Sequence, residues 1–372
     1  MKGIELMEKR KKLLFHINSM GKGGAEKVVS VLSERFAKDG YETVVATLWQ
    51  ADTEYTLSDD VRRINLGDKN SSKNRGRIAL ALGRLLDLRK MIREERPDLV
   101  ISFCNKANFR CAYSMAGIKI PLLVSVRNDP RVDYYPHKYG MRQMEKKASG
   151  CVFQTYDAME CFGEEFRKKS KVIWNPLDDK YMVSGCKGEE RSNYIVSVGR
   201  LCVQKNQLLL LKAFRRIMEE FPQYELRIYG EESDAGVKES LCKYIDENGM
   251  GGRVRFMGQS SHLEREMRDA SLFVLSSDYE GLPNALMEAM ALGIPVVSTD
   301  CPCGGPRELI EDGVSGLLIP TGSEEGLFMA VKKLLNDPKL AWQIGKEGEK
   351  VKEKAAPDAI YQEWKKFVEE LT

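Results

Sequence analysis

Two basic side chains, Arg200 and Lys205, lie five residues apart between the β-branched run Tyr194–Val198 and a long helical pattern. In open parallel sheets, ligands bind at the carboxyl ends of the strands, where such a loop would lie. An arginine fork and a lysine point charge can together neutralise two phosphate groups. The alternative is two solvated cations at a helix start, an arrangement that the helix dipole opposes. The pair therefore predicts a site that stabilises a leaving diphosphate.

Two acids, Glu280 and Glu288, lie eight residues apart in the segment Asp278–Ala291. Glu280 follows the apolar run Ser271–Leu275, so we expect its carboxylate to be unpaired in a strand-end loop, where it can hold sugar hydroxyls. Glu288 is expected about one turn inside a helix, where it can accept two hydrogen bonds from a ribose diol. The alternative is that they are an ordinary helix-start acid and a helix-surface acid.

The helix that carries Glu288 is expected to begin at Pro283, because proline is favoured at the first helical position. The amide groups around Asn284 and Ala285 would then lack partners inside the helix. Such amides attract phosphate because they lie at the positive end of the helix dipole. The segment therefore predicts a second phosphate cradle.

A glycine-rich stretch, Gly21–Glu26, links the apolar run Lys11–Asn18 to a helical pattern. Its Gly23 and Gly24 would let a ligand approach the backbone closely. The stretch reads GKGGAE rather than the full GxGxxG, and no carboxylate clearly closes the next strand to hold a ribose. It predicts either a loop for a phosphate or another polar ligand or a plain turn, and it disfavours a standard dinucleotide site.

Alternating strand-like and helix-like segments position these residues. Helical patterns include Gln207–Phe221 and Asn284–Ala291. The fold class is therefore α/β, with a first domain over residues 1–175, a second over 176–355, and a last helix over 356–372 that we expect to return to the first. The expected strands are residues 11–18, 42–48, 99–103, 122–126, 150–154, 194–198, 225–229, 254–257, 271–275, 295–298 and 316–319.

The composition limits the class of protein. A length of 372 residues favours two domains, and 30% charged with 42% hydrophobic residues is typical of a soluble globular chain. No apolar run approaches the roughly 18 residues of a membrane-spanning helix, and the start MKGIELMEKRKK lacks the apolar core of a secretion signal. Nine cysteines without a CxxC pair predict reduced cytosolic thiols, and Cys301-Pro-Cys303 is too tight for a usual zinc site.

Charge is divided unevenly along the chain. Residues 1–175 hold 33 basic and 22 acidic side chains, a net charge of +11, whereas residues 176–372 hold 25 and 33, a net charge of −8. Within residues 62–96, apolar side chains are interleaved with many cations, which predicts either a basic amphipathic helix on an anionic membrane or an ordinary helix with a solvated rim. Nucleic acid is disfavoured, because this stretch lacks interleaved aromatics and any binding motif. The cations are Arg62, Arg63, Lys69, Lys73, Arg75, Arg77, Arg84, Arg89, Lys90, Arg93 and Arg96.

Together, the motifs resemble those of the retaining glycosyltransferases of family 4. The resemblance covers essentially the whole chain and is strongest over residues 194–322. It implies the GT-B fold, in which two Rossmann-like, doubly wound parallel-sheet domains face each other across a cleft. It rests on Glu280-x7-Glu288 with Gly281-Leu282, Ala289-x-Ala291-x-Gly293-x-Pro295-Val296, Gly199-Arg200 with Lys205, Gly23-Gly24-Ala25-Glu26 and Asp312–Leu318.

The resemblance also implies roles for individual residues. Catalysis would fall to Glu280, near the transferred sugar, and to Arg200 and Lys205, which would bind the diphosphate. Glu288 would bind the ribose of the donor. No DxD sequence occurs, and the resemblance implies that neither a metal nor another cofactor is needed. The remaining donor-site residues would be Gly23, Gly24, Gln259, Gly281, Leu282, Pro283, Asn284 and Ala285.

One departure from the family pattern concerns a histidine that many relatives place near the sugar. In the matching stretch of this sequence, Arg127 and Asn128 stand instead, and they are the candidates for the sugar or acceptor side. We expect His137 on the surface, His16 in a core strand and His262 at a helix start.

These features predict a cytosolic enzyme at the inner face of the cell membrane. By the resemblance, it would move a hexose or N-acetylhexosamine from a nucleotide sugar, chiefly a UDP-sugar, to a lipid-linked glycan, with retention by front-face attack. The segments Ser125–Asn128 and Cys301–Pro306 are similar to those of polysaccharide and lipid-linked oligosaccharide transferases. Three alternatives stay open: transfer to a soluble acceptor, a UDP-sugar epimerase of the same architecture, and a nucleotide-sugar-binding protein without turnover.

Overall fold

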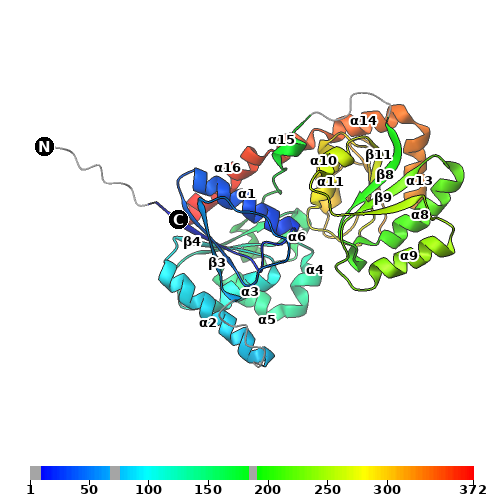
Figure 1. The fold of residues 1–372 in the computed structure, drawn as a ribbon. Helices are drawn as coiled ribbons and strands as arrows, with labels where there is room; N and C mark the ends of the chain where they lie inside the picture. Colours follow the sequence, from blue (N-terminus) through cyan, green and yellow to red (C-terminus); the bar gives the residue numbers. More distant parts are fainter. Residues whose placement is uncertain (1–9, 68–75, 184–190) are drawn as a thin grey trace. The chain divides into compact units, whose positions relative to one another are not determined.

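The chain folds into two compact units, each with one parallel sheet (Figure 1). The computed structural model describes residues 10–67, 76–183 and 191–372. Unit 1 comprises the described residues up to Pro176 together with Ile360–Thr372, and unit 2 comprises those of Leu177–Ala359. In the described part of the chain, every helix is too short or too polar to span a bilayer. The expected α/β class with two parallel sheets is confirmed.

The sheet of unit 1 has seven strands in the order β3-β2-β1-β4-β5-β6-β7. His16, the last residue of β1, lies in register between Ala46 of β2 and Ser102 of β4. Because the chain winds outward in both directions from β1 and β4, this pair forms the topological switch point of the sheet. The strands are β1 (Lys12–His16), β2 (Glu42–Thr47), β3 (Val61–Asn65), β4 (Leu99–Phe103), β5 (Leu122–Ser125), β6 (Gly150–Phe153) and β7 (Ser170–Val172).

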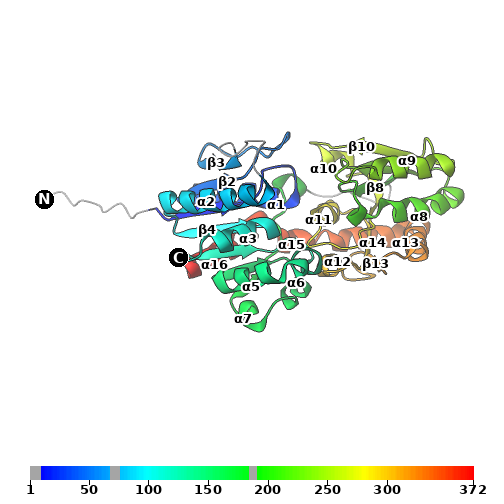
Figure 2. The same ribbon diagram turned by 90° about the horizontal axis from the view of Figure 1, so that it is seen from below.

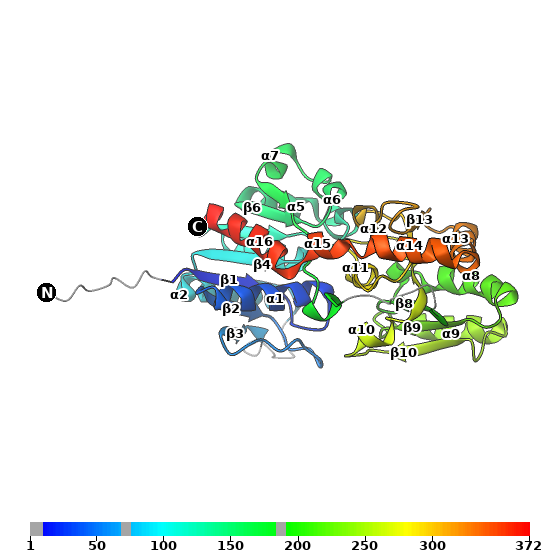
Figure 3. The ribbon, with the colours of Figure 1, turned by 90° about the horizontal axis from the view of Figure 1, so that it is seen from above.

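Helices cover both faces of this sheet. On one face, α1 (Gly24–Lys38) and α16 (Pro357–Leu371) enclose the core, where the Phe103 ring stacks on Trp364 at 5.7 Å between centroids (Figure 3). On the other face, α2 packs beside α3, and α3 beside α5 (Figure 2). The last helix is therefore part of the core of unit 1. The remaining helical segments are α2 (Arg77–Glu95), α3 (Asn105–Ser114), α4 (Pro130–Asp133), η2 (Tyr135–His137), α5 (Lys138–Lys147), α6 (Tyr156–Glu160) and α7 (Glu164–Arg167).

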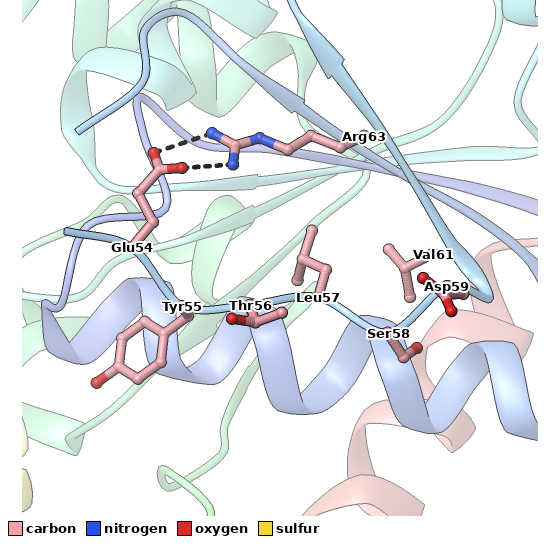
Figure 4. A pocket seen from close by; sticks show the side chains of 8 residues that line it. All are labelled: Glu54, Tyr55, Thr56, Leu57, Ser58, Asp59, Val61 and Arg63. Carbon is pink, nitrogen blue, oxygen red and sulfur yellow. Dashed lines mark hydrogen bonds and ion pairs between the residues drawn. The ribbon is translucent and has the colours of Figure 1, made fainter. Parts of the chain in front are cut away.

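The basic stretch of residues 62–96 is not one helix. Residues 62–65 belong to strand β3, and helix α2 begins only at Arg77. Arg63 Nη2 donates to Glu54 Oε1 at 2.9 Å beside a pocket of about 430 Å³ in unit 1 (Figure 4). Arg62 likewise pairs with Glu95, so both arginines are neutralised within the fold. Lys69, Lys73 and Arg75 of the predicted stretch lie outside the described residues.

The sheet of unit 2 has six strands in the order β10-β9-β8-β11-β12-β13. Its switch point lies between β8 and β11, so the loops that follow these two strands start at the same place on the carboxyl edge. The strands are β8 (Ser192–Val198), β9 (Glu225–Tyr229), β10 (Val254–Gly258), β11 (Ala270–Leu275), β12 (Val296–Thr299) and β13 (Leu317–Ile319).

The helices of unit 2 enclose a core of leucine, isoleucine and valine side chains. Helices α8, α9 and α13 lie on one face of the sheet, and α10 and α11 lie on the other (Figure 1). The helical segments are η3 (Asp179–Tyr181), η4 (Val203–Lys205), α8 (Gln207–Glu220), α9 (Val237–Glu247), α10 (Leu263–Glu266), α11 (Asn284–Ala291), α12 (Gly305–Leu309), α13 (Glu324–Asn336), α14 (Pro338–Gly348) and α15 (Val351–Ala355).

Candidate active site

The loop after β8 delivers Lys205 to the carboxyl edge of the unit 2 sheet. A Cβ on Gly199 would lie 3.1 Å from Cε of Lys205, so the glycine leaves room for the lysine stem. The loop ends at Asn206, whose backbone is left-handed (φ 44°) and whose side chain caps α8 by accepting from the Leu209 amide at 3.2 Å. The short loop between β8 and α8 thus fixes the position of the lysine.

Lys205 forms a buried ion pair with Glu280 of the loop after β11. Lys205 Nζ lies 2.5 Å from Glu280 Oε1, and the Ser277 hydroxyl donates to the same oxygen at 2.6 Å. Glu280 is only 6% exposed. The expectation of an unpaired Glu280 is therefore wrong, because the neighbouring strands β8 and β11 bring their two loops together.

The backbone of Glu280 is held by the segment Cys301-Pro-Cys303. The Glu280 amide donates to Pro302 O at 2.6 Å, and the Cys303 amide donates to Glu280 O at 3.0 Å. Both cysteines are fully buried, and burial raises the pKa of the Cys301 thiol to about 12. The described residues hold no cluster of three or more potential metal ligands. This segment acts as a support for Glu280, a function that the sequence reasoning missed.

Four further hydrogen bonds join the same two loops, and one of them runs from Ser276 Oγ to Lys205 O at 3.0 Å. Gln204 Nε2 donates to Tyr279 O at 2.9 Å, and the Asp278 amide donates to Gln204 O at 2.9 Å. Asn206 Nδ2 donates to Asp278 Oδ1 at 2.8 Å. These bonds hold Lys205 and Glu280 in one arrangement before any ligand binds.

Arg200, the other predicted cation, differs from Lys205. Its side chain is exposed, and no carboxylate among the described residues lies within ion-pair distance of it. Its carbonyl accepts a hydrogen bond from Gln207 Nε2 at 2.8 Å, which fixes the backbone. The predicted basic pair therefore consists of one lysine balanced inside the protein and one arginine that faces solvent.

Glu288 on α11 is also buried, at 7% exposure, so it is not a helix-surface acid. Tyr181 of η3 hydrogen-bonds with it, and burial, followed by the charge of Glu288, raises the pKa of Tyr181 well above its usual range. Because a phenol with such a pKa stays protonated, it serves as a donor to the carboxylate. Tyr181 is a second contact that the sequence reasoning did not find.

Helix α11 has the bounds predicted from its helical pattern, Asn284–Ala291, but Pro283 precedes the helix instead of being its first residue. Its first backbone bond runs from the Met287 amide to Pro283 O at 3.1 Å, so the amides of residues 284–286 precede the helical ladder. Gly281, Leu282 and Pro283 are buried, Asn284 and Ala285 are half-buried, and Gln259 after β10 is exposed.

In unit 1, the predicted residues lie at the carboxyl edge of the other sheet. Gly23 precedes α1, which begins at Gly24. Arg127 Nη1 donates to Ser125 Oγ at 3.3 Å, Nη2 donates to Asn175, and burial lowers the pKa of Arg127 to about 10. The side chain of Asn128 hydrogen-bonds with Asp133.

The histidines lie where the sequence places them. His137 and His262 are exposed, and His262 immediately precedes α10. His16 is fully buried at the end of β1, and its Nδ1–H donates to Ala46 O at 2.9 Å. Burial, followed by the charge of Arg110, lowers the pKa of His16 to about 3, so the ring is neutral near pH 7.

Comparisons with known proteins agree with this architecture. The model of the family described as Glycosyltransferase Family 4 matches residues 22–180, and that of Glycosyl transferases group 1 matches residues 187–351. The structure of HepE from Anabaena in complex with UDP and glucose superposes with a TM-score of 0.80 and 18% identity, covering 97% of this chain and 100% of that one. This likeness shows the fold.

Two relatives come from Campylobacter jejuni. One is the GalNAc-α-(1→4)-GalNAc-α-(1→3)-diNAcBac-PP-undecaprenol α-1,4-N-acetyl-D-galactosaminyltransferase, 24% identical over 97% of this chain and 99% of the relative. The other is the N-acetylgalactosamine-N,N'-diacetylbacillosaminyl-diphospho-undecaprenol 4-α-N-acetylgalactosaminyltransferase, 28% identical over 88% of this chain and 91% of the relative. With both family models matched along its length and this fold, the chain belongs to the family 4 glycosyltransferases of the GT-B type.

Proposed function

We propose that the protein is a retaining, metal-independent glycosyltransferase that moves a hexose or N-acetylhexosamine from a UDP-sugar to a lipid-linked glycan. The names of the two Campylobacter relatives, which act on diphospho-undecaprenol glycans, support the acceptor class. The UDP and glucose in the complex of the structural neighbour HepE support the donor class. The acceptor would be part of surface polysaccharide or glycoconjugate synthesis at the inner face of the membrane.

The observation that carries this proposal is the buried Lys205–Glu280 pair with the exposed Arg200 on the same loop. A carboxylate held by a lysine and a serine is fixed in position, as a group that contacts a sugar with developing positive charge must be. Arg200 can add a bidentate contact to phosphate. Positive charge for the diphosphate and negative charge for the sugar thus lie together on two joined loops.

The reaction would proceed on one face of the sugar. The bond between the anomeric carbon and the diphosphate oxygen breaks, and the acceptor hydroxyl oxygen bonds to that carbon from the same side. The hydroxyl proton passes to the departing phosphate oxygen. Arg200 and Lys205 stabilise the charge of the departing diphosphate, Glu288 holds the ribose, and the amides at the start of α11 hold phosphate.

A nucleotide-sugar panel read by thermal shift tests the donor class. A ligand that binds only the folded protein raises its stability by RT ln(1 + [L]/Kd), so UDP-sugars should raise the melting temperature and nicotinamide dinucleotides should not.

The anomeric configuration of the product, measured by NMR, shows whether transfer occurs with retention. Release of a free epimerised sugar would instead favour the epimerase. Activity lost in EDTA and restored by Mg²⁺ would contradict metal independence.

A second proposal concerns membrane binding by helix α2. Its Ile78, Leu82 and Leu86 are spaced at successive helical turns and are 86%, 56% and 58% exposed. Such an apolar stripe, with Arg84 and nearby Lys90 and Arg93 on the same helix, is typical of a helix that lies in an anionic membrane interface. The stripe, rather than the whole stretch 62–96, is the proposed contact.

Co-sedimentation with vesicles tests this contact. We expect binding to phosphatidylglycerol vesicles that weakens as salt is raised, and little binding to phosphatidylcholine. The double change Ile78→Asp with Leu82→Asp should abolish binding. Met329→Asp on α13, where Met329 is 51% exposed, is the matched control and should leave binding unchanged. Equal binding by the double variant and the wild type would refute the proposal.

A further inference from the structure

Arg110 of helix α3 is a half-buried guanidinium held by two neutral groups. Its Nη1 lies 3.0 Å from His16 Nε2 and 3.1 Å from Asn18 Oδ1. Because His16 uses its Nδ1–H to donate to Ala46 O, its Nε2 carries a lone pair and accepts from the arginine. His16 and Asn18 therefore orient the guanidinium without neutralising it.

The charge of Arg110 has no counter-charge in the described part of the chain. None of the ion pairs found there includes Arg110, and no acceptor there binds its Nη2 or Nε. Arg84 of the neighbouring helix α2 adds a like charge: burial, together with the charge of Arg84, lowers the pKa of Arg110 to about 10. Two guanidinium groups that repel each other in a partly desolvated place are stabilised when an anion binds between them.

Arg110 lies at the switch point of the unit 1 sheet, which is where a ligand is expected to bind. His16 is the last residue of β1, and β1 and β4 form the switch point of the seven-stranded sheet. In open α/β sheets, ligands bind outside the carboxyl ends of the strands at this point. Asn18 begins the connection that continues into Gly21–Gly24, where glycines allow close approach to the backbone.

We propose that Arg110, oriented by His16 and Asn18, binds a phosphate group of the acceptor substrate. This rests on the proposed function, in which the acceptor carries a diphosphate and the donor diphosphate binds to Arg200 and Lys205 of unit 2. A guanidinium has five N–H donors. Because His16 and Asn18 both contact Nη1, the edge formed by Nε and Nη2 remains for bidentate phosphate binding. Arg84 supplies charge for the second phosphate of the same diphosphate.

Inorganic pyrophosphate is the probe for this site, and thermal shift of the full chain is the readout. The titration is made with saturating UDP, so that the donor site of unit 2 is occupied. Wild-type protein should still be stabilised by pyrophosphate, and Arg110→Gln should need about tenfold more of it, since a hydrogen bond to a charged group contributes about 1.5–3 kcal/mol. Arg110→Lys should recover part of the affinity.

Arg142→Gln, which removes one charge from an exposed site on α5, is the matched control and should bind pyrophosphate like the wild type. In transfer assays, Arg110→Gln should raise the KM for the diphosphate-bearing acceptor and leave the KM for the UDP-sugar unchanged. A raised KM for the UDP-sugar instead would assign the phosphate to the donor and overturn the proposal.

The proposal is also overturned if Arg110→Gln binds pyrophosphate as well as the wild type, or if UDP abolishes pyrophosphate binding. If no UDP-sugar binds or reacts, the proposed function fails, whereas the difference in pyrophosphate binding between the wild type and Arg110→Gln still reports on Arg110. The two failures are therefore distinguishable. His16→Gln, which alters only the support of the guanidinium, should weaken pyrophosphate binding less than Arg110→Gln does.

Discussion

The two units carry a cation at the same place, the carboxyl edge next to the switch point, but they balance its charge differently. In unit 2, Lys205 is paired with Glu280 at 2.5 Å. In unit 1, the contacts that the structure describes for Arg110 are with the neutral side chains of His16 and Asn18. A cation that is paired inside the protein keeps its geometry without a ligand. A cation without a counter-charge gains one when an anionic ligand binds. We therefore expect the edge of unit 2 to depend on its own charges and that of unit 1 to depend on its substrate.

The largest expected effect comes from breaking the pair in unit 2. Glu280→Gln should lower the transfer rate by about 10²–10³-fold, because the carboxylate that we propose to face the developing charge is lost. It should also lower the free energy of unfolding by about 3 kcal/mol, because the buried Lys205 ammonium loses its partner. Initial rates at saturating UDP-sugar and urea unfolding measure the two effects.

Lys205→Met in the Glu280→Gln background is the control for this prediction. Replacing both members of a buried pair with neutral groups should recover most of the stability. It should not recover transfer, because the cation that we propose to bind the diphosphate is also gone. Transfer by Glu280→Gln at the wild-type rate would show that the proposed catalytic assignment is wrong.

The next effect concerns acid stability at the edge of unit 1. His16 has a folded pKa of about 3 against an ordinary value of 6.5, so between these pH values the unfolded chain binds a proton that the folded chain does not. The resulting stability is complete above about pH 6.5 and falls as the pH is lowered, by about 1.4 kcal/mol per pH unit.

His16→Gln, which keeps a donor and an acceptor, should remove this contribution. The difference in unfolding free energy between wild type and variant should therefore change with pH between 6 and 4, which urea titrations at a series of pH values can measure. A constant difference over that range would mean that His16 is not held neutral. Gln343→Ala, which removes no ionisable group at an exposed site, is the control, and its difference from the wild type should stay constant over the same pH range.

The smallest effect tests how firmly the loops of unit 2 are joined. Gln204→Ala removes the donor to Tyr279 O and should lower the free energy of unfolding by about 1 kcal/mol, the usual net value of one hydrogen bond. The exposed Gln343 on α14 is the matched site, and Gln343→Ala should change stability by less than about 0.5 kcal/mol. Equal effects at the two positions would mean that this bond does not hold the loops.

Most of the strands could be predicted because buried parallel strands are short apolar runs, and β4 and β9 were predicted with their observed bounds. Strands β3 (VRRIN) and β7 (SKV) were missed because they lie at the edges of the sheet and are too polar for that pattern. The same polarity led to the wrong prediction of a helix over residues 62–65.

The candidate site could be predicted as a set of loops but not as a set of contacts. Arg200, Lys205 and Glu280 follow apolar strands, which is enough to place them at a carboxyl edge. The Lys205–Glu280 pair joins residues 75 positions apart, and the order of strands decides which loops meet. Nothing local marks Arg110 either, because its partner His16 lies 94 residues earlier in the chain.

The place of α16 in unit 1 has a consequence for how the protein is made. Trp364 fills the core beside Phe103, yet it is synthesised only after the whole of unit 2. At a ribosomal rate of about 5–20 residues per second, roughly 10–40 s pass between the synthesis of the unit 1 strands and the synthesis of this helix. During that time the aromatic face that α16 will cover is exposed on the nascent chain. Unit 2 can complete its core first, and unit 1 is the part of the newly made chain on which chaperones would act.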